Sequence, residues 1–177
     1  MSSDTLARAF YPSRRSVISC GTVPIDITHG TVLLVRKRST NEILLPKGRK
    51  DENECLKAAA LRETYEETGY SATILPLKLP THATNRSGNE LHTEPIAVTQ
   101  RVSDHGLKLI FWYAGSVNSQ KLPERGTQQE GEDFESKWMD CRQAIAALTF
   151  ADDKEVAQLV IHAVFDAYSI PEDAASS

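Results

Sequence analysis

The chain has 177 residues, of which 40% are hydrophobic and 25% are charged, an ordinary composition for a soluble globular protein. This length favours a single domain over residues 1–177 with one substantial core. The net charge of −4 argues against a general nucleic-acid-binding protein, because such proteins usually present a basic surface.

Targeting signals and cysteine usage indicate the compartment. Residues 1–10 are polar and lack the apolar centre of a secretory signal. No apolar run approaches the roughly 18 residues that a membrane helix needs. The three cysteines, Cys20, Cys55 and Cys141, are widely spaced and odd in number, so they cannot all pair within the chain. We therefore expect a reduced protein of the cytoplasm or the nucleus, with no membrane partner.

The N-terminal third is predicted to be rich in strands. Residues 1–14 should form a loose N-terminal arm. β-Branched residues predict strands over 16–23 and 31–35, separated by a turn. A short strand over 43–45 should stop at Pro46, which cannot continue a hydrogen-bonded ladder.

A loop over 46–50 is then predicted to lead into a central helix. Asp51 and Glu54 have the spacing of a capping box, so we expect the helix to start at Asp51. Gly69 suits the left-handed position that ends a helix.

The rest of the chain alternates strands with polar loops before two C-terminal helices. The tail over 174–177 is expected to fray. Strands are predicted over 71–79, 96–102, 107–117 and 134–139, helices over 142–148 and 152–168, an insertion loop over 81–95 and a second polar loop over 119–133.

The central helix carries an acidic cluster. Glu63, Glu66 and Glu67 are spaced i, i+3 and i+4, so their side chains share one helix face. Like charges this close destabilise a helix by roughly 0.2–0.5 kcal/mol per pair unless a cation neutralises them. Hard divalent ions prefer oxygen ligands, and Mg2+ is usually held by one or two carboxylates together with substrate phosphates. The cluster therefore indicates a metal-dependent hydrolase of a phosphate ester or anhydride. Mg2+ is the first candidate ion and Mn2+ the second, and we expect Glu66 and Glu67 to face solvent and metal.

The sequence from residue 48 to residue 70 resembles the Nudix box, G-x5-E-x7-R-E-U-x-E-E-x-G-U, where U is a bulky aliphatic residue. Thr64 and Tyr70 replace the aliphatic residue at two packing positions. The resemblance implies an α/β/α sandwich around a mixed β-sheet. The seven charged or glycine positions of the box all match: Gly48, Glu54, Arg62, Glu63, Glu66, Glu67 and Gly69.

The resemblance also implies roles for these residues. Glu63, Glu66 and Glu67 would supply the metal ligands and the catalytic base, in an assignment that the sequence leaves open. The backbone carbonyl at the turn of Lys47 and Gly48 would complete the metal shell. Arg62 would orient Glu63 or pair with Glu66.

Each of the other nearby carboxylates has two possible roles. Glu54 serves either the metal shell or the helix cap. Glu130 or Glu132 in the second polar loop could complete the site, although acidic loops often serve only solubility. The plain alternative for the whole cluster is a solvated acidic helix face.

Short basic clusters flank the box and resemble those of diphosphoinositol polyphosphate and diadenosine polyphosphate phosphohydrolases. Many Lys and Arg donors beside a metal site suit a ligand with more phosphates than the metal can neutralise. An ordinary solvated surface is the alternative. The candidate substrate-binding residues are Arg14, Arg15, Arg36, Lys37, Arg38, Lys47 and Arg49.

The sequence thus predicts hydrolysis of a phosphoanhydride in a polyphosphorylated small molecule. Inositol pyrophosphates are the first candidate substrates and diadenosine polyphosphates the second. The alternatives are an ADP-ribose, nucleoside-triphosphate or mRNA-cap pyrophosphohydrolase and, from another class, a non-catalytic Nudix-fold nucleotide sensor.

Overall fold

The computed structural model describes residues 8–84 and 90–168. Parts of the expected N-terminal arm and insertion loop, and the whole of the expected frayed tail, lie outside these residues. Within them, every helix is too short or too polar to cross a membrane.

Eight strands form one mixed sheet, in which the first and seventh strands run parallel and the other pairs are antiparallel. The central order is β3-β2-β1-β7-β5, while β4 pairs with β1, β6 with β7 and β8 with β2. The strands are β1 (Ser16–Asp26), β2 (Thr31–Lys37), β3 (Ile43–Leu44), β4 (Lys47–Arg49), β5 (Thr73–Ile74), β6 (Ala97–Ser103), β7 (Gly106–Ser116) and β8 (Phe134–Asp140).

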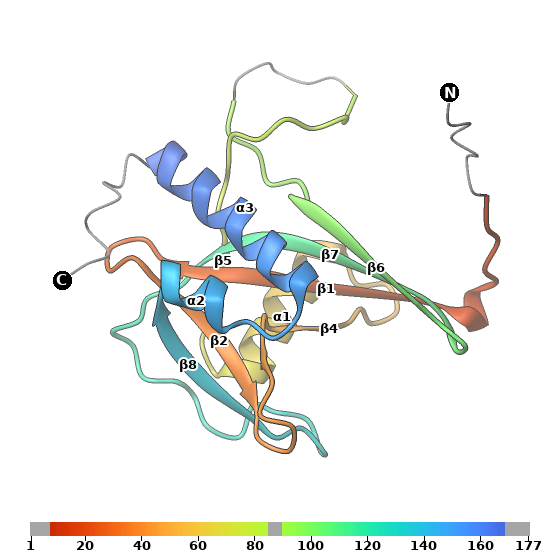
Figure 1. The fold of residues 1–177 in the computed structure, drawn as a ribbon, viewed down its shortest axis with the longest axis horizontal. Coiled ribbons are helices and arrows are strands. Elements are labelled where there is room, and N and C mark those ends of the chain that lie inside the picture. Colours follow the sequence, from red (N-terminus) through yellow and green to blue (C-terminus); the bar gives the residue numbers. More distant parts are fainter. Residues whose placement is uncertain (1–7, 85–89, 169–177) are drawn as a thin grey trace.

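Helices cover both faces of the sheet, which confirms the predicted α/β/α sandwich. The α2 (Cys141–Ala147) and α3 (Ala151–Tyr168) helices lie on one face, and α1 (Leu56–Thr68) lies on the other (Figure 1). Trp112 and Tyr113 are neighbours in β7 and point to opposite faces. Trp112 packs in the main core with α3, whereas Tyr113 packs with α1, and both side chains are buried.

Two details around α1 differ from prediction. The expected loop over 46–50 contains the strand β4, which pairs antiparallel with the first half of β1. The helix begins at Leu56 rather than at Asp51. Glu54 does accept a hydrogen bond from the Asp51 backbone N–H, at 2.9 Å, but Arg62 also binds the Glu54 carboxylate, so this turn belongs to an ion-pair network outside the helix. As predicted, the helix ends at Gly69, which has a φ of 77°.

The residues at the two aliphatic positions of the box both have partners. The Thr64 hydroxyl lies 2.7 Å from the Thr22 hydroxyl of β1, in a buried contact between helix and sheet. The ring of Tyr70 packs edge-on against Trp138, with 5.4 Å between the ring centroids. Both are therefore packing positions, with a polar partner for Thr64 and an aromatic partner for Tyr70.

The remaining elements follow the sequence prediction except in one place. The hairpin of β6 and β7, the strand β8 and the two C-terminal helices are all present. The strand predicted over 71–79 is reduced to β5, followed by a single bridge between Leu77 and His92. Pro76 interrupts this segment because it has no N–H for the ladder.

Candidate active site

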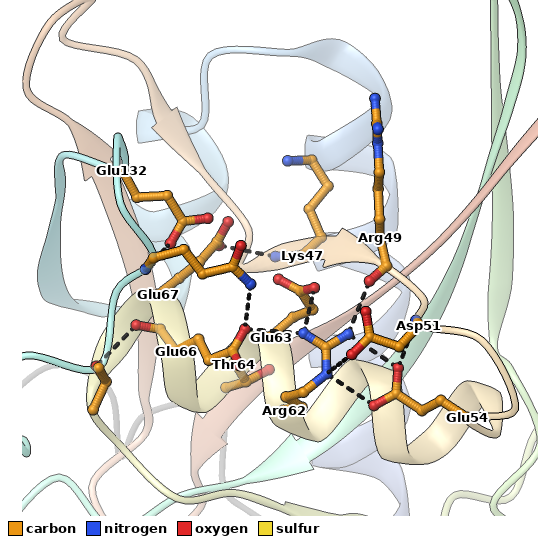
Figure 2. A network of polar contacts seen from close by, with 12 residues as sticks. Lys47, Arg49, Asp51, Glu54, Arg62, Glu63, Thr64, Glu66, Glu67 and Glu132 are labelled. Carbon is orange, nitrogen blue, oxygen red and sulfur yellow. Dashed lines mark hydrogen bonds and ion pairs between the residues drawn. The ribbon is translucent and has the colours of Figure 1, made fainter.

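The acidic helix face lies directly against β4. A Cβ atom added at Gly48 would sit 1.9 Å from the Oε2 atom of Glu63, so only glycine leaves room for this carboxylate. The Lys47 backbone N–H donates a hydrogen bond of 3.0 Å to Glu67 (Figure 2). Gly48 therefore leaves space for the Glu63 carboxylate, and Lys47 holds the Glu67 carboxylate by a hydrogen bond.

Arg62 connects the carboxylates on this side of the helix (Figure 2). Its Nη1 atom lies 2.8 Å from Glu63 and 2.9 Å from Glu66. Its Nε atom lies 2.9 Å from Glu54, and its Nη2 atom donates to the Arg49 carbonyl at 2.8 Å. These partners raise the pKa of the guanidinium further above its ordinary value. The same ion pair, with the Asp51 N–H, lowers the pKa of Glu54. Glu54 thus anchors Arg62.

The three clustered glutamates differ strongly in exposure. We expected Glu66 and Glu67 to face solvent, and for Glu67 this is wrong because its residue is only 3% exposed. Burial raises the pKa of Glu67 to about 8, and the charge and the N–H of Lys47 only partly oppose the effect. Burial also raises the pKa of Glu63, against the opposing ion pair with Arg62. Glu66 is the most accessible of the three, with 23% of its side chain exposed.

The polar loop after β7 closes over the C-terminal end of α1. The Thr127 hydroxyl donates to the Glu66 carbonyl, and the Gln128 amide donates to the Glu67 carbonyl. The Gln129 amide reaches the Glu66 carboxylate at 3.1 Å, on the same Oε2 atom that Arg62 binds.

The loop also brings one of the two acidic candidates close. The charge of Glu132 contributes to the raised pKa of both Glu63 and Glu67. Figure 2 shows the Glu132 carboxylate above Glu67. Glu130 takes no part in these interactions, so Glu132 is the better placed of the two.

The donors at this site suit a divalent cation. Burial raises the pKa values of two carboxylates, Glu63 and Glu67, and a hard cation bound between them would favour their charged forms. Among residues 8–84 and 90–168, however, no three acidic, His or Cys side chains are already arranged around a common point. Arg62 lies between Glu63 and Glu66 and binds both carboxylates. The residues that would hold the ion are Glu63, Glu66, Glu67 and Glu132, with the Lys47 carbonyl. A bound divalent cation would activate a water molecule and neutralise charge on the phosphoryl oxygens.

A row of cations follows the opposite face of the sheet at this point. The register places Lys47 beside Gly21 and Arg49 beside Ser19, so both side chains lie on the face that α3 covers. Figure 2 shows both side chains pointing away from α1. Lys108 in β7 pairs with Val17 of β1 and Arg101 of β6, which extends the row across four strands. We call Lys47, Arg49, Lys108 and Arg101 the sheet-face row.

The neighbouring cations of the row affect the pKa of Lys108. Burial, followed by the charges of Lys47, Arg101 and Arg49, lowers the pKa of Lys108 to about 8. Among the described residues, Lys47, Arg49 and Lys108 form no ion pair, whereas Arg101 binds Asp152 and Asp153. Beside the row, the Ser19 hydroxyl is buried and has no hydrogen-bond partner. The sequence analysis missed Lys108, although a lysine inside the apolar strand 107–114 is a recognisable signal.

The other predicted basic residues do not gather with this row. Arg14 and Arg15 lie just before β1, where Arg15 donates to the Asp104 carbonyl. Arg36 lies at the far end of β2 and is ion-paired with Glu135 of β8.

Lys37 and Arg38 lie at the same distant end of β2. Lys37 pairs with Phe134 in the β2–β8 ladder, and the Arg38 backbone N–H binds the Asp133 carbonyl. The predicted set is therefore divided among the turn before β1, the end of β2 and the strand β4, and only Lys47 and Arg49 of β4 adjoin the carboxylates.

Comparisons with known proteins identify the family and support the fold. A model of the NUDIX domain matches residues 17–160. No curated protein sequence matches the chain. Similar solved structures include a NUDIX hydrolase from Nitrosomonas europaea, at 16% identity over 82% of this chain and 88% of that one with a TM-score of 0.58. An Ap4A hydrolase from C. elegans is 19% identical over 81% of this chain and 95% of that one, also with a TM-score of 0.58. A MutT protein from Bacillus halodurans is 18% identical over 82% of each chain, with a TM-score of 0.57.

The fold and the carboxylate site define a hydrolase of the pyrophosphatase type. The chain belongs to the Nudix family, whose members generally use divalent cations such as Mg2+ and act on small phosphorylated substrates.

Proposed function

We propose that this protein hydrolyses, with Mg2+, a phosphoanhydride bond in a highly phosphorylated small molecule. We retain the two substrate classes that the sequence predicts, with inositol pyrophosphates as the first candidate and diadenosine polyphosphates as the second. The observation that carries the proposal is the sheet-face row, in which Lys47, Arg49 and Lys108 form no ion pair with any described residue and adjoin the carboxylate site at β4. Such a row suits a ligand whose phosphates extend beyond the reach of the metal.

The row and the carboxylates can serve one substrate because they meet at β4. Lys47 places its backbone N–H on Glu67 and its side chain in the row. The charge of Glu67 also acts on Lys108, in the opposite sense to the neighbouring cations. A phosphate chain crossing β4 would thus contact catalytic carboxylates at one end and cations at the other.

Within the site, Glu66 is the residue that we assign to proton transfer. Arg62 and Gln129 both bind its Oε2 atom, and Oε1 has no hydrogen-bond partner among the described residues. Glu66 is also the glutamate of the cluster that solvent reaches best. Its free oxygen can accept a proton from an attacking water, while Arg62 fixes the orientation of the carboxylate.

A hydrolysis screen that separates and identifies the products of each substrate by chromatography tests the proposal. The wild-type protein and Glu66→Gln would be assayed with Mg2+ on inositol pyrophosphates, diadenosine polyphosphates, ADP-ribose and capped RNA. We expect turnover of a polyphosphorylated substrate and at least a hundredfold loss in the variant. Preferred turnover of ADP-ribose or capped RNA would overturn the substrate assignment. Binding without turnover of any compound would favour a nucleotide sensor.

A further inference from the structure

A pocket lies beside the C-terminal end of α1, between the polar loop and the start of β8. Its volume is about 450 Å3, within the usual range for small-molecule sites. We call it the loop pocket. The residues that line it and carry the argument are Arg38, Thr68, Arg125, Thr127, Gln128 and Phe134.

The charges of the loop pocket favour an anion. Its two acidic residues are occupied, since Glu124 accepts a hydrogen bond from Tyr65 and Glu135 binds Arg36 and Lys137. The side chains of Arg38 and Arg125 are exposed and form no hydrogen bond or ion pair with the described residues. The pocket therefore presents two available guanidinium groups and two carboxylates that are already bound.

The C-terminal end of α1 adjoins the pocket, and its hydrogen bonds reduce the repulsion that the helix dipole would exert on an anion. A helix leaves its last four carbonyls unpaired, and these carry partial negative charge. Here the Glu66, Glu67 and Thr68 carbonyls accept hydrogen bonds from Thr127, Gln128 and Ser136, respectively. The Tyr65 carbonyl accepts from the Gly69 N–H that ends the helix. All four carbonyls are thus satisfied before a ligand arrives.

An aromatic ring completes the wall. Phe134 is only partly buried, and it packs against none of the three hydrophobic clusters of the described structure. Its backbone is held in place, because the Phe134 N–H and carbonyl both bind the Gln128 side-chain amide, at 3.0 and 2.8 Å. An aromatic ring outside the hydrophobic clusters, next to guanidinium groups that form no ion pair with the described residues, suits stacking of a planar base beside a phosphate.

We propose that the loop pocket binds one nucleoside end of a dinucleoside polyphosphate, with the purine on Phe134 and its nearest phosphate on Arg38 and Arg125. The inference rests on the proposed phosphoanhydride hydrolysis and selects between its two substrate classes, since an inositol pyrophosphate has no planar base. The loop links the pocket to the chemistry: Gln128 lines the pocket, and the next residue, Gln129, binds the Glu66 carboxylate. The phosphate chain would run from the loop pocket past the carboxylates toward the sheet-face row.

Direct binding and kinetics test the pocket separately from the reaction. Adenosine 5′-monophosphate is the binding probe, titrated calorimetrically into the full chain and into Phe134→Leu, Arg125→Gln and Lys108→Met. We expect Phe134→Leu and Arg125→Gln to weaken binding by at least about fivefold, and Lys108→Met, in the sheet-face row, to retain it. Phe134→Leu should also raise KM for diadenosine pentaphosphate and leave KM for an inositol pyrophosphate unchanged. Thermal unfolding checks that each variant is folded.

The outcomes separate the two proposals. Equal nucleotide affinity in wild type and Phe134→Leu, or a loss confined to Lys108→Met, would overturn the pocket assignment even if diadenosine polyphosphates are hydrolysed. Conversely, Phe134-dependent nucleotide binding without hydrolysis of any dinucleoside polyphosphate or inositol pyrophosphate would leave the pocket in place and refute the proposed function.

Discussion

Replacing Glu67 with glutamine should remove turnover and, at the same time, stabilise the metal-free protein near neutral pH. Glu67 is 3% exposed, and burial raises its pKa from 4.5 to about 8. Between these two values the folded state keeps a proton that the unfolded state releases. The free energy of unfolding therefore falls as pH rises through this window and becomes constant above the folded-state pKa.

The size of the effect follows from the pKa difference. Each pH unit within the window costs about 1.36 kcal/mol, so the wild-type protein loses at most about 4 kcal/mol between pH 4.5 and about pH 7.5. Glutamine has the same shape, can still accept the Lys47 N–H and carries no charge to desolvate. The variant should lack this pH-dependent loss.

Urea unfolding with a metal chelator, at about pH 5 and about pH 7.5, measures the effect. The difference between wild type and Glu67→Gln should grow with pH, and Mg2+ should reduce it by binding only the wild-type carboxylate. Glu66→Gln is the matched control, because Glu66 lies one residue away with 23% of its side chain exposed. If the wild-type protein gains stability relative to Glu67→Gln over this range, Glu67 is not the buried carboxyl described above.

Three further changes test other parts of the site. Gly48→Ala would place a Cβ 1.9 Å from Glu63, so kcat should fall about a hundredfold, and unchanged kcat would show that the carboxylate can move aside. In steady-state assays at low salt, Lys108→Met should raise KM about tenfold for the substrate with the most phosphates and less for substrates with fewer. An equal rise in KM for all substrates would argue against the sheet-face row. Gly69 and Gly126 have nearly the same φ, 77° and 76°, but a Cβ added at Gly69 would lie 2.3 Å from a backbone carbonyl, whereas one at Gly126 would have no atom within 4 Å. Gly69→Ala should therefore lower the free energy of unfolding by more than the roughly 1 kcal/mol expected for Gly126→Ala. Equal urea midpoints would contradict that clash.

The sequence alone was sufficient to predict the family, the layered fold and the carboxylates. Helical periodicity places Glu63, Glu66 and Glu67 on one face, and glycine at positions 48 and 69 marks a close approach and a helix end. These are local properties that depend on spacing along the chain, and the structure has them where they were predicted.

Only the tertiary structure decided which groups surround each carboxylate and how deeply each one is buried. Spacing along a helix does not reveal which member of a cluster is covered, so Glu67 was expected in solvent and lies buried beneath β4 and the polar loop. The sheet-face row depends on the pairing of β4, β1, β7 and β6, which joins residues up to 61 positions apart, from Lys47 to Lys108. Strand register is set by packing of the whole sheet, and that is why Lys108 and the loop pocket emerge only from the folded chain.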